Sequence, residues 1–305
     1  MSMQALDGRF CRSHQRQRSE IIWEFSSGGK RMKAFLLAGG HGTRLRPLTD
    51  TIPKCLVPIQ GRALLDIWLD LCASAGIDEV LINLHAHARA VEQHLCQYAA
   101  PVTVRVVEEH DLLGSAGTVA ANRVWIGSDP AFWIFYADVL TNTNLTRMSE
   151  FHSRHEGVVT LGLYQVPDPS RCGVAVVDNT GLIVDFEEKP CHPRSNWAFS
   201  GLMMASPSLF DWIPPYVPAD IGFHVLPRLR GKMWAHLIGD YLLDIGTLPN
   251  YQQAQATWPG CGNHLAVLGT AGQSFSAQRP SAQRPAGYER QNRGSCGRSH
   301  ERRTT

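Results

Sequence analysis

The chain has 305 residues, of which 44% are hydrophobic and 18% are charged, and its formal net charge is +2. These proportions are typical of a globular protein with a sizeable core, and no apolar run approaches the roughly 18 residues that cross a bilayer. The eight cysteines are scattered without a Cys-x-x-Cys pair, which argues against a disulfide scaffold or a zinc site. We therefore expect a cytoplasmic protein that does not bind membranes.

The basic residues are concentrated at the two ends of the chain. Residues 1–31 contain six Lys/Arg and three acidic residues, and residues 257–305 contain seven Arg and two acidic residues. Subtracting both ends from the 29 Lys/Arg and 27 Asp/Glu of the chain leaves a middle part with a net charge of −6. A nucleic-acid-binding protein needs basic residues on a folded face, so we expect no nucleic-acid partner.

The composition divides the chain into three segments. Residues 1–31 form an extension that we expect to be disordered, and residues 32–256 form the folded domain. Residues 257–305 are rich in Gly, Ser, Gln and Arg and repeat Ser-Ala-Gln-Arg-Pro at 276–280 and 281–285. Few apolar side chains are present there to offset the entropy of ordering, so this basic tail is predicted to be disordered.

The folded segment begins with alternating strands and helices. Apolar runs predict strands, and helical spacing of apolar residues predicts helices. In chain order, these elements are a strand at 33–38, a helix at 63–75, a strand at 80–84, a helix at 88–98, a strand at 102–107, a helix at 116–125, a strand at 132–136 and a helix at 144–155. This rhythm predicts an α/β fold with a mostly parallel sheet, flanked by helices, that binds ligands at the carboxyl ends of its strands.

The rhythm changes after residue 157. Closely spaced strands are predicted at 158–166, 173–177, 182–186 and 198–205, and Asp178-Asn-Thr-Gly181 is a turn sequence between the second and third. We expect these strands to form an antiparallel extension of the same sheet that faces the substrate.

A glycine-rich loop follows the first strand. It reads Ala38-Gly-Gly-His-Gly-Thr-Arg-Leu-Arg-Pro-Leu-Thr49, with Pro53-Lys54 shortly after. Glycines let backbone N–H groups approach phosphate oxygens, and Arg44 and Lys54 supply positive charge. The loop is neither a Walker A motif nor Gly-x-Gly-x-x-Gly. An ordinary glycine-rich turn is the alternative that these residues alone leave open.

This loop resembles the signature of the sugar-1-phosphate nucleotidyltransferase family, and the resemblance extends over residues 32–256 in at least five blocks. It implies a Rossmann-like nucleotidyltransferase fold with an antiparallel sugar-binding extension. It also implies that Arg44 and Lys54 are catalytic, on the phosphate side of the site. The nucleotide-binding residues implied by the loop are Ala38, Gly39, Gly40, Gly42 and Thr43.

The second block, Leu113-Gly-Ser-Ala-Gly-Thr118, is similar to the base-reading loop of guanylyltransferases in this family. The implied nucleotide-binding residues are Gly114, Ser115, Ala116 and Gly117. Tight packing of a helix on its neighbour would explain the same small residues equally well. Glu109 lies just upstream, and its carboxylate could accept hydrogen bonds from guanine N1–H and the 2-amino group, which favours GTP.

Two aspartates are the candidate metal ligands. Asp138 follows the apolar strand 132–136, where its carboxylate needs a partner such as Mg²⁺ on a triphosphate. A capping role in the next turn is the alternative. Asp244, in Tyr241-Leu-Leu-Asp-Ile-Gly-Thr247, resembles the second metal-binding position of the family. Asp138 is therefore assigned both a catalytic and a metal-binding role, with Mg²⁺ as the cofactor.

The sugar-phosphate side is predicted from two later blocks. Glu188-Lys189-Pro190 resembles the family's Glu-Lys-Pro, in which Glu binds sugar hydroxyls and Lys the sugar phosphate, although the tripeptide alone is more typical of a solvated strand end. Gly173 resembles the glycine of a family Arg-Tyr-Gly-Val element, with Cys172 in place of tyrosine. Phe199 lies at a sugar-facing position where guanylyltransferases more often have Asn-Ala-Gly.

The resemblance implies transfer of a nucleotidyl group from a nucleoside triphosphate to a sugar 1-phosphate, with release of pyrophosphate. GTP and mannose 1-phosphate are the favoured partners. The alternatives are a thymidylyl- or uridylyltransferase for glucose 1-phosphate, a heptose-1-phosphate guanylyltransferase, and a non-catalytic subunit that senses nucleotide sugars. Association into a homo-oligomer is a further expectation.

Overall fold

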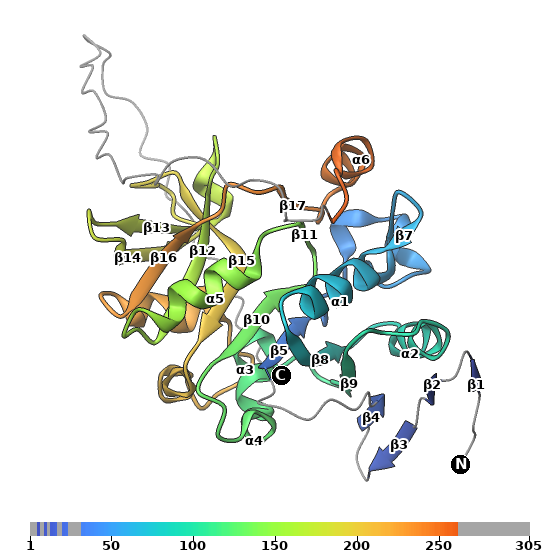
Figure 1. Ribbon diagram of the computed structural model, residues 1–305. Helices are drawn as coiled ribbons and strands as arrows, with labels where there is room; N and C mark the ends of the chain where they lie inside the picture. Colours follow the sequence, from blue (N-terminus) through green and yellow to red (C-terminus); the bar gives the residue numbers. More distant parts are fainter. Residues whose placement is uncertain (1–4, 7–8, 11–12, 17–19, 24–31, 262–305) are drawn as a thin grey trace, which may run out of the picture. The chain divides into compact units, whose positions relative to one another are not determined.

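The computed structural model describes residues 5–6, 9–10, 13–16, 20–23 and 32–261 (Figure 1). The chain divides into two units, Met1–Phe275 and Ser276–Thr305, and every described residue belongs to the first. Within the described ranges, no helix is both long and apolar enough to cross a membrane.

Four parallel strands form the centre of an 11-stranded sheet. Their order in space is β10 (Phe132–Tyr136), β5 (Met32–Leu37), β8 (Ile77–Leu84) and β9 (Thr103–Glu108). Most of their residues are buried, as expected when helices cover both faces of a parallel sheet. Leu37 at the end of β5 lies opposite Tyr136 on one side and Asn83 on the other. The carboxyl ends of these strands therefore meet at one edge of the sheet.

Helices cover both faces of this sheet. Residues of α1, α2 and α5 share one apolar core with Leu36 and Trp133, while residues of α3 and α4 pack against Phe35 on the opposite face. The helices are α1 (Leu64–Ser74), α2 (Ala88–Gln97), α3 (Gly114–Ala121), α4 (Arg123–Ile126), α5 (Leu145–Ser153) and α6 (Leu248–Thr257). Each of the four helices predicted from the sequence is present, the one at 116–125 as the pair α3 and α4.

The antiparallel extension joins the parallel strands through β15 (Trp197–Ala205), which pairs antiparallel with β10. The other strands of this region are β12 (Val159–Gln165), β13 (Gly173–Val177), β14 (Leu182–Glu188) and β16 (Met233–Leu237). Strand β15 also pairs with β12 and β13, and β14 follows β13 as an antiparallel hairpin. The predicted fold class is confirmed, and the sequence did not predict β16, which pairs parallel with β12 and antiparallel with β14.

Two small sheets lie within residues 32–261. The strands β11 (Val139–Thr141) and β17 (Leu242–Asp244) pair antiparallel, with Val139 opposite Asp244. The strands β6 (Pro58–Ile59) and β7 (Arg62–Ala63) form a short hairpin next to α1. The first of these sheets matters for function because it brings the two candidate metal-binding aspartates together.

The N-terminal segment contains short strands where the sequence analysis expects disorder. They are β1 (Ala5–Leu6), β2 (Arg9–Phe10), β3 (Ser13–Arg16) and β4 (Glu20–Trp23). Strand β4 pairs antiparallel with β9 and extends the large sheet at that edge. The disorder predicted for the rest of 1–31 and for most of the tail, 262–305, concerns residues outside the described ranges.

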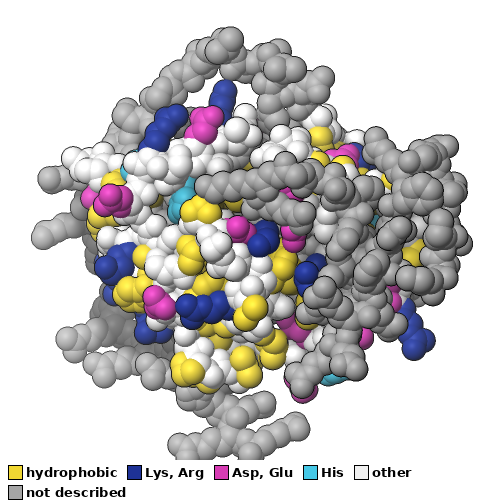
Figure 2. All heavy atoms as spheres, turned by 60° about the horizontal axis from the view of Figure 1, so that its bottom comes forward, with side chains coloured by type: hydrophobic (Ala, Val, Ile, Leu, Met, Phe, Trp, Pro, Cys, Tyr) yellow, Lys and Arg dark blue, Asp and Glu magenta, His cyan; other side chains and the backbone are white. Residues whose placement is uncertain are grey.

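Charged side chains are mixed on the part of the surface that Figure 2 shows. Lys and Arg alternate with Asp and Glu among hydrophobic and neutral polar side chains. On the described residues of this face, basic side chains therefore do not form a continuous stripe.

Candidate nucleotide-binding and catalytic site

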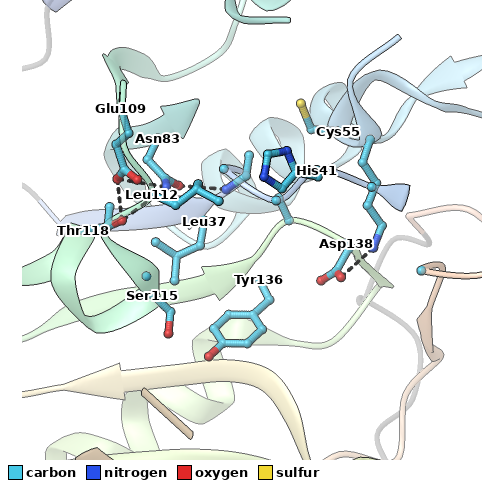
Figure 3. Close-up of a pocket in the computed structure, with 18 of the residues that line it drawn as sticks. Leu37, His41, Cys55, Asn83, Glu109, Leu112, Ser115, Thr118, Tyr136 and Asp138 are labelled. Carbon is cyan, nitrogen blue, oxygen red and sulfur yellow. Dashed lines mark hydrogen bonds and ion pairs between the residues drawn. The ribbon is translucent and has the colours of Figure 1, made fainter. Parts of the chain in front are cut away.

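A cavity of about 480 Å³ opens at the carboxyl ends of the parallel strands (Figure 3). This volume lies in the range of small-molecule sites. The predicted residues that line it are Ala38, Gly39, Gly40, Gly42, Thr43, Arg44, Lys54, Glu109, Gly114, Ser115 and Asp138. The lining residues for which the sequence predicted no role are Leu37, His41, Cys55, Asn83, Leu112, Thr118, Tyr136, Ala137 and Gly246.

The glycine-rich loop is fixed to the neighbouring strand by Asn83. The Ala38 N–H donates to Asn83 Oδ1 over 2.9 Å, and a Cβ at Gly39 would lie 2.6 Å from Asn83 Nδ2. Gly42 has a φ of 64°, in the left-handed region, and its carbonyl accepts a hydrogen bond from the Thr49 hydroxyl over 2.7 Å. Gly39 is thus required by close contact, and Gly42 by backbone conformation.

The predicted catalytic charges converge at Gly246. The Lys54 Nζ lies 2.7 Å from Asp138 Oδ2, and Asp244 Oδ1 accepts the Gly246 N–H over 2.5 Å. A Cβ placed on Gly246 would lie 3.0 Å from both Arg44 Nη2 and Lys54 Nζ, and 2.7 Å from Asp244 Oδ1. Three charged side chains therefore lie against one glycine of the cavity lining, and Asp138 is joined to them by its ion pair with Lys54.

The pair Asp138 and Asp244 fits a divalent cation. Burial raises the pKa of Asp244, and the neighbouring charge of Asp138 raises it further, against the opposing charges of Lys54 and Arg44. A bound cation would relieve the repulsion between the two carboxylates. Among the described residues, no group of three or more His, Cys, Asp or Glu could hold a metal ion. Two carboxylates and substrate phosphate oxygens are, however, a usual ligand set for Mg²⁺.

The small residues at the start of α3 serve mainly to pack the helix. Gly114 has a φ of 76°, and a Cβ there would lie 2.4 Å from the Ala219 carbonyl oxygen. The N–H groups of Ala116 and Gly117 donate to that same oxygen, over 2.9 and 3.2 Å. Neither Ala116 nor Gly117 lines the cavity, whereas Gly114 and Ser115 do. For Ala116 and Gly117, the described contacts match the alternative of tight helix packing.

Glu109 is buried and already carries internal hydrogen bonds. Its Oε1 accepts from Asn83 Nδ2 over 3.1 Å and from the Thr118 hydroxyl over 2.5 Å, and its Oε2 accepts from the Leu113 N–H over 3.3 Å. These bonds link β8, α3 and the loop before α3 (Figure 3). The carboxylate therefore organises this wall of the cavity, and Oε2 retains the greater capacity to accept from a ligand.

None of the predicted sugar-phosphate residues lines the cavity. A Cβ at Gly173 would lie 2.6 Å from Glu188 Oε2, so this glycine leaves room for the carboxylate. Burial raises the pKa of Glu188, which Lys189 partly offsets at an Nζ–Oε1 distance of 3.8 Å. Lys189 has a φ of 50°, an uncommon conformation for this residue type. The Phe199 ring contacts Tyr136, which lines the cavity.

The proteins similar to this chain include mannose-1-phosphate guanylyltransferases. Mannose-1-phosphate guanylyltransferase 1 of Arabidopsis thaliana is 30% identical over 227 residues, which cover 72% of this chain and 63% of that protein. The catalytic subunit beta of mannose-1-phosphate guanylyltransferase from Drosophila melanogaster is 31% identical over 223 residues, covering 72% and 60%. The chain thus spans less than two thirds of the length of these relatives.

Two solved structures share the fold. One is a candidate glucose-1-phosphate thymidylyltransferase from Bacillus anthracis in complex with sucrose, with a TM-score of 0.65, 22% identity and coverage of 74% of this chain and 94% of that one. The other is HddC from Yersinia pseudotuberculosis, with a TM-score of 0.63, 23% identity and coverage of 74% and 98%. Residues 33–259 match the family model described as Nucleotidyl transferase. The chain therefore belongs to the nucleotidyl transferase family.

Proposed function

We propose that this protein joins a nucleoside triphosphate to a sugar 1-phosphate and releases pyrophosphate, with GTP and mannose 1-phosphate as the favoured pair. The observation that carries the proposal is the convergence of Arg44, Lys54, Asp138 and Asp244 around Gly246, beside a glycine-lined cavity. A protein that only binds nucleotides needs no such pair of carboxylates next to two cations.

The reaction is an in-line displacement at phosphorus. An oxygen of the sugar 1-phosphate forms a bond to the α-phosphorus, and the bond from that phosphorus to the bridging oxygen breaks. Pyrophosphate leaves with the electron pair. The attacking phosphate monoester is already an anion, so no strong general base is required.

The chain contributes alignment and charge. Arg44 and Lys54 neutralise the phosphates of the nucleotide, and Lys189 directs the acceptor phosphate towards them. A lysine suits that task because a flexible ammonium group can follow the phosphate as it moves. Mg²⁺ bound by Asp138 and Asp244 would supply further positive charge to the triphosphate oxygens.

The preference for GTP and mannose 1-phosphate has two supports. The relatives from Arabidopsis and Drosophila are named mannose-1-phosphate guanylyltransferases, and the segment Leu113–Gly117 resembles the guanylyltransferase version of the base loop. A thymidylyl- or uridylyltransferase for glucose 1-phosphate and a heptose-1-phosphate guanylyltransferase are the alternatives within the same chemistry. The cytoplasmic location and a homo-oligomeric state stay predictions.

Pyrophosphate release by the full chain tests the proposal. GTP, dTTP, UTP, CTP and ATP are each combined with mannose, glucose and heptose 1-phosphates in the presence of Mg²⁺. Turnover with GTP and mannose 1-phosphate would support the favoured pair, and turnover with another pair would keep the reaction and correct the substrates. Binding of GTP without turnover in any combination would contradict catalysis and favour the sensing subunit.

A further inference from the structure

Tyr136 ends strand β10, and its side chain lines the cavity (Figure 3). Phe132 and Ile134, which precede it on the same face of the strand, are fully buried, whereas Tyr136 is half-buried. An apolar side chain would suffice to continue the core at this position. A phenol at the cavity wall instead combines an apolar ring with a hydroxyl that needs a polar partner.

The ring of Tyr136 is held by two residues of β15. Phe199 packs edge-on against it, with ring centroids 5.7 Å apart and planes at 75°. Gly201 has a φ of 80°, and a Cβ there would lie 3.1 Å from the Tyr136 Cβ. A glycine at position 201 therefore leaves room for the tyrosine. The ring thus has a fixed place beside Phe199, a residue predicted to bind the sugar phosphate.

The hydroxyl of Tyr136 can donate one hydrogen bond and accept others. Tyr136 shares the cavity lining with Ser115 and Asp138. Asp138 marks the side of the reacting phosphates, and Glu188 marks the predicted sugar side.

Ser115, which also lines the cavity, connects the two halves of the site. The Ser115 hydroxyl donates to Asp220 Oδ2 over 2.9 Å and accepts from the backbone N–H of Ile221 over 2.7 Å. These bonds tie the first turn of α3 to the π-helix Ile221–Val225. A Cβ at Gly222 would lie 2.4 Å from Glu188 Oε2, so the predicted sugar-binding carboxylate lies against this π-helix.

We propose that Tyr136 is a specificity-determining residue for the acceptor, whose hydroxyl hydrogen-bonds a ring hydroxyl of the sugar 1-phosphate between Glu188 and the reacting phosphates. Its ring limits the space available to that sugar. This inference rests on the proposed function, because it places the sugar on the Glu188 side of the cavity.

The variant Tyr136→Phe removes the hydroxyl and keeps the ring. We expect KM for the sugar 1-phosphate to rise about 3–10-fold, the size of one lost hydrogen bond, with KM for the nucleoside triphosphate within about twofold of wild type. Calorimetric titrations with GDP-mannose and with GDP measure the same contact without turnover. The variant should lose affinity for GDP-mannose and retain its affinity for GDP.

The control is Tyr98→Phe. The Tyr98 hydroxyl donates a hydrogen bond of 2.9 Å to Asp70 Oδ1, and neither residue lines the cavity. This control should leave both KM values unchanged. An unchanged KM for the sugar in Tyr136→Phe, or an equal rise for both substrates, would overturn the role of Tyr136 while wild-type turnover upholds the proposed function. If the wild type releases no pyrophosphate, the proposed function fails, and the titrations then test the role of Tyr136. A selective loss of affinity for GDP-mannose in the variant supports that role. Unchanged or undetectable binding of GDP-mannose overturns it.

Discussion

Replacing Gly246 by alanine tests whether the charges around it act in catalysis. The new methyl group would lie 2.7 Å from Asp244 Oδ1 and 3.0 Å from both Arg44 Nη2 and Lys54 Nζ. These distances are shorter than ordinary van der Waals contact, so the three side-chain ends must move by several tenths of an ångström. Such side chains can move at little cost in stability, but the charges would leave the positions that align the phosphates. A misplacement approaching 1 Å can cost about 10²-fold in rate.

We therefore expect kcat/KM for Gly246→Ala to fall about 10²-fold in the pyrophosphate-release assay. Its Tm should stay within a few degrees of wild type, since the backbone at Gly246 is not in the left-handed region. Gly239→Ala is a matched control, because a Cβ at Gly239 would meet nothing within 4 Å. A Gly246→Ala enzyme within twofold of wild type, or an equal loss in Gly239→Ala, would refute the reasoning.

Three further predictions concern single side chains. Asp138→Ala, Arg44→Ala and Lys189→Ala should each lower turnover on the order of 10²–10³-fold, and near-normal turnover of the Asp138 variant would remove the metal assignment. Asp244→Asn should abolish turnover yet raise Tm at neutral pH, because burial and Asp138 raise the pKa of Asp244. The pKa of this carboxyl is higher in the folded state than in the unfolded state. Its ionisation therefore lowers the free energy of unfolding as the pH rises from the unfolded-state pKa to the folded-state pKa. The Tm gain of the variant should thus vanish in acid, and a gain independent of pH would contradict the assignment. Glu109→Gln places an amide N–H among hydrogen-bond donors and should lower the free energy of unfolding by about 1–3 kcal/mol in a denaturant titration; an unchanged midpoint would show that the buried network is not needed.

Much of the fold is predictable because its signals are local. The apolar run at 132–136 predicts β10 with the bounds that the structure has, and the turn Asp178–Gly181 correctly separates β13 from β14. Strand β16 was not predicted, because Met233–Leu237 is short, contains an alanine and a histidine, and depends on pairing with β12 and β14. Its identity as a strand comes from partners that are distant in the sequence.

Some residues of the site can likewise be identified from the sequence, and others only from the structure. Arg44 and Lys54 stand in a motif that identifies them, whereas Asn83 has no motif and acts through hydrogen bonds to Ala38 and Glu109 from the adjacent strand. Gly246 lies inside the block Tyr241–Thr247, but its importance appears only when Arg44 and Lys54 from other segments are seen beside it. Residues that act by leaving space cannot be identified from their own side-chain chemistry.

The environment of Glu109 changes the argument for guanine. From the sequence, its carboxylate is a free acceptor for guanine N1–H and the 2-amino group. In the structure, three internal donors already use it: Asn83, Thr118 and the Leu113 N–H. A guanine would therefore have to share Oε2 with the backbone or displace that bond, at 3.3 Å the longest of the three. The support for GTP now comes more from the relatives than from this residue, and a comparison of GTP with dTTP in the Glu109→Gln variant separates the two roles. A selective loss of GTP turnover would indicate direct reading of the base, and an equal loss for both nucleotides would indicate that Glu109 shapes the cavity wall.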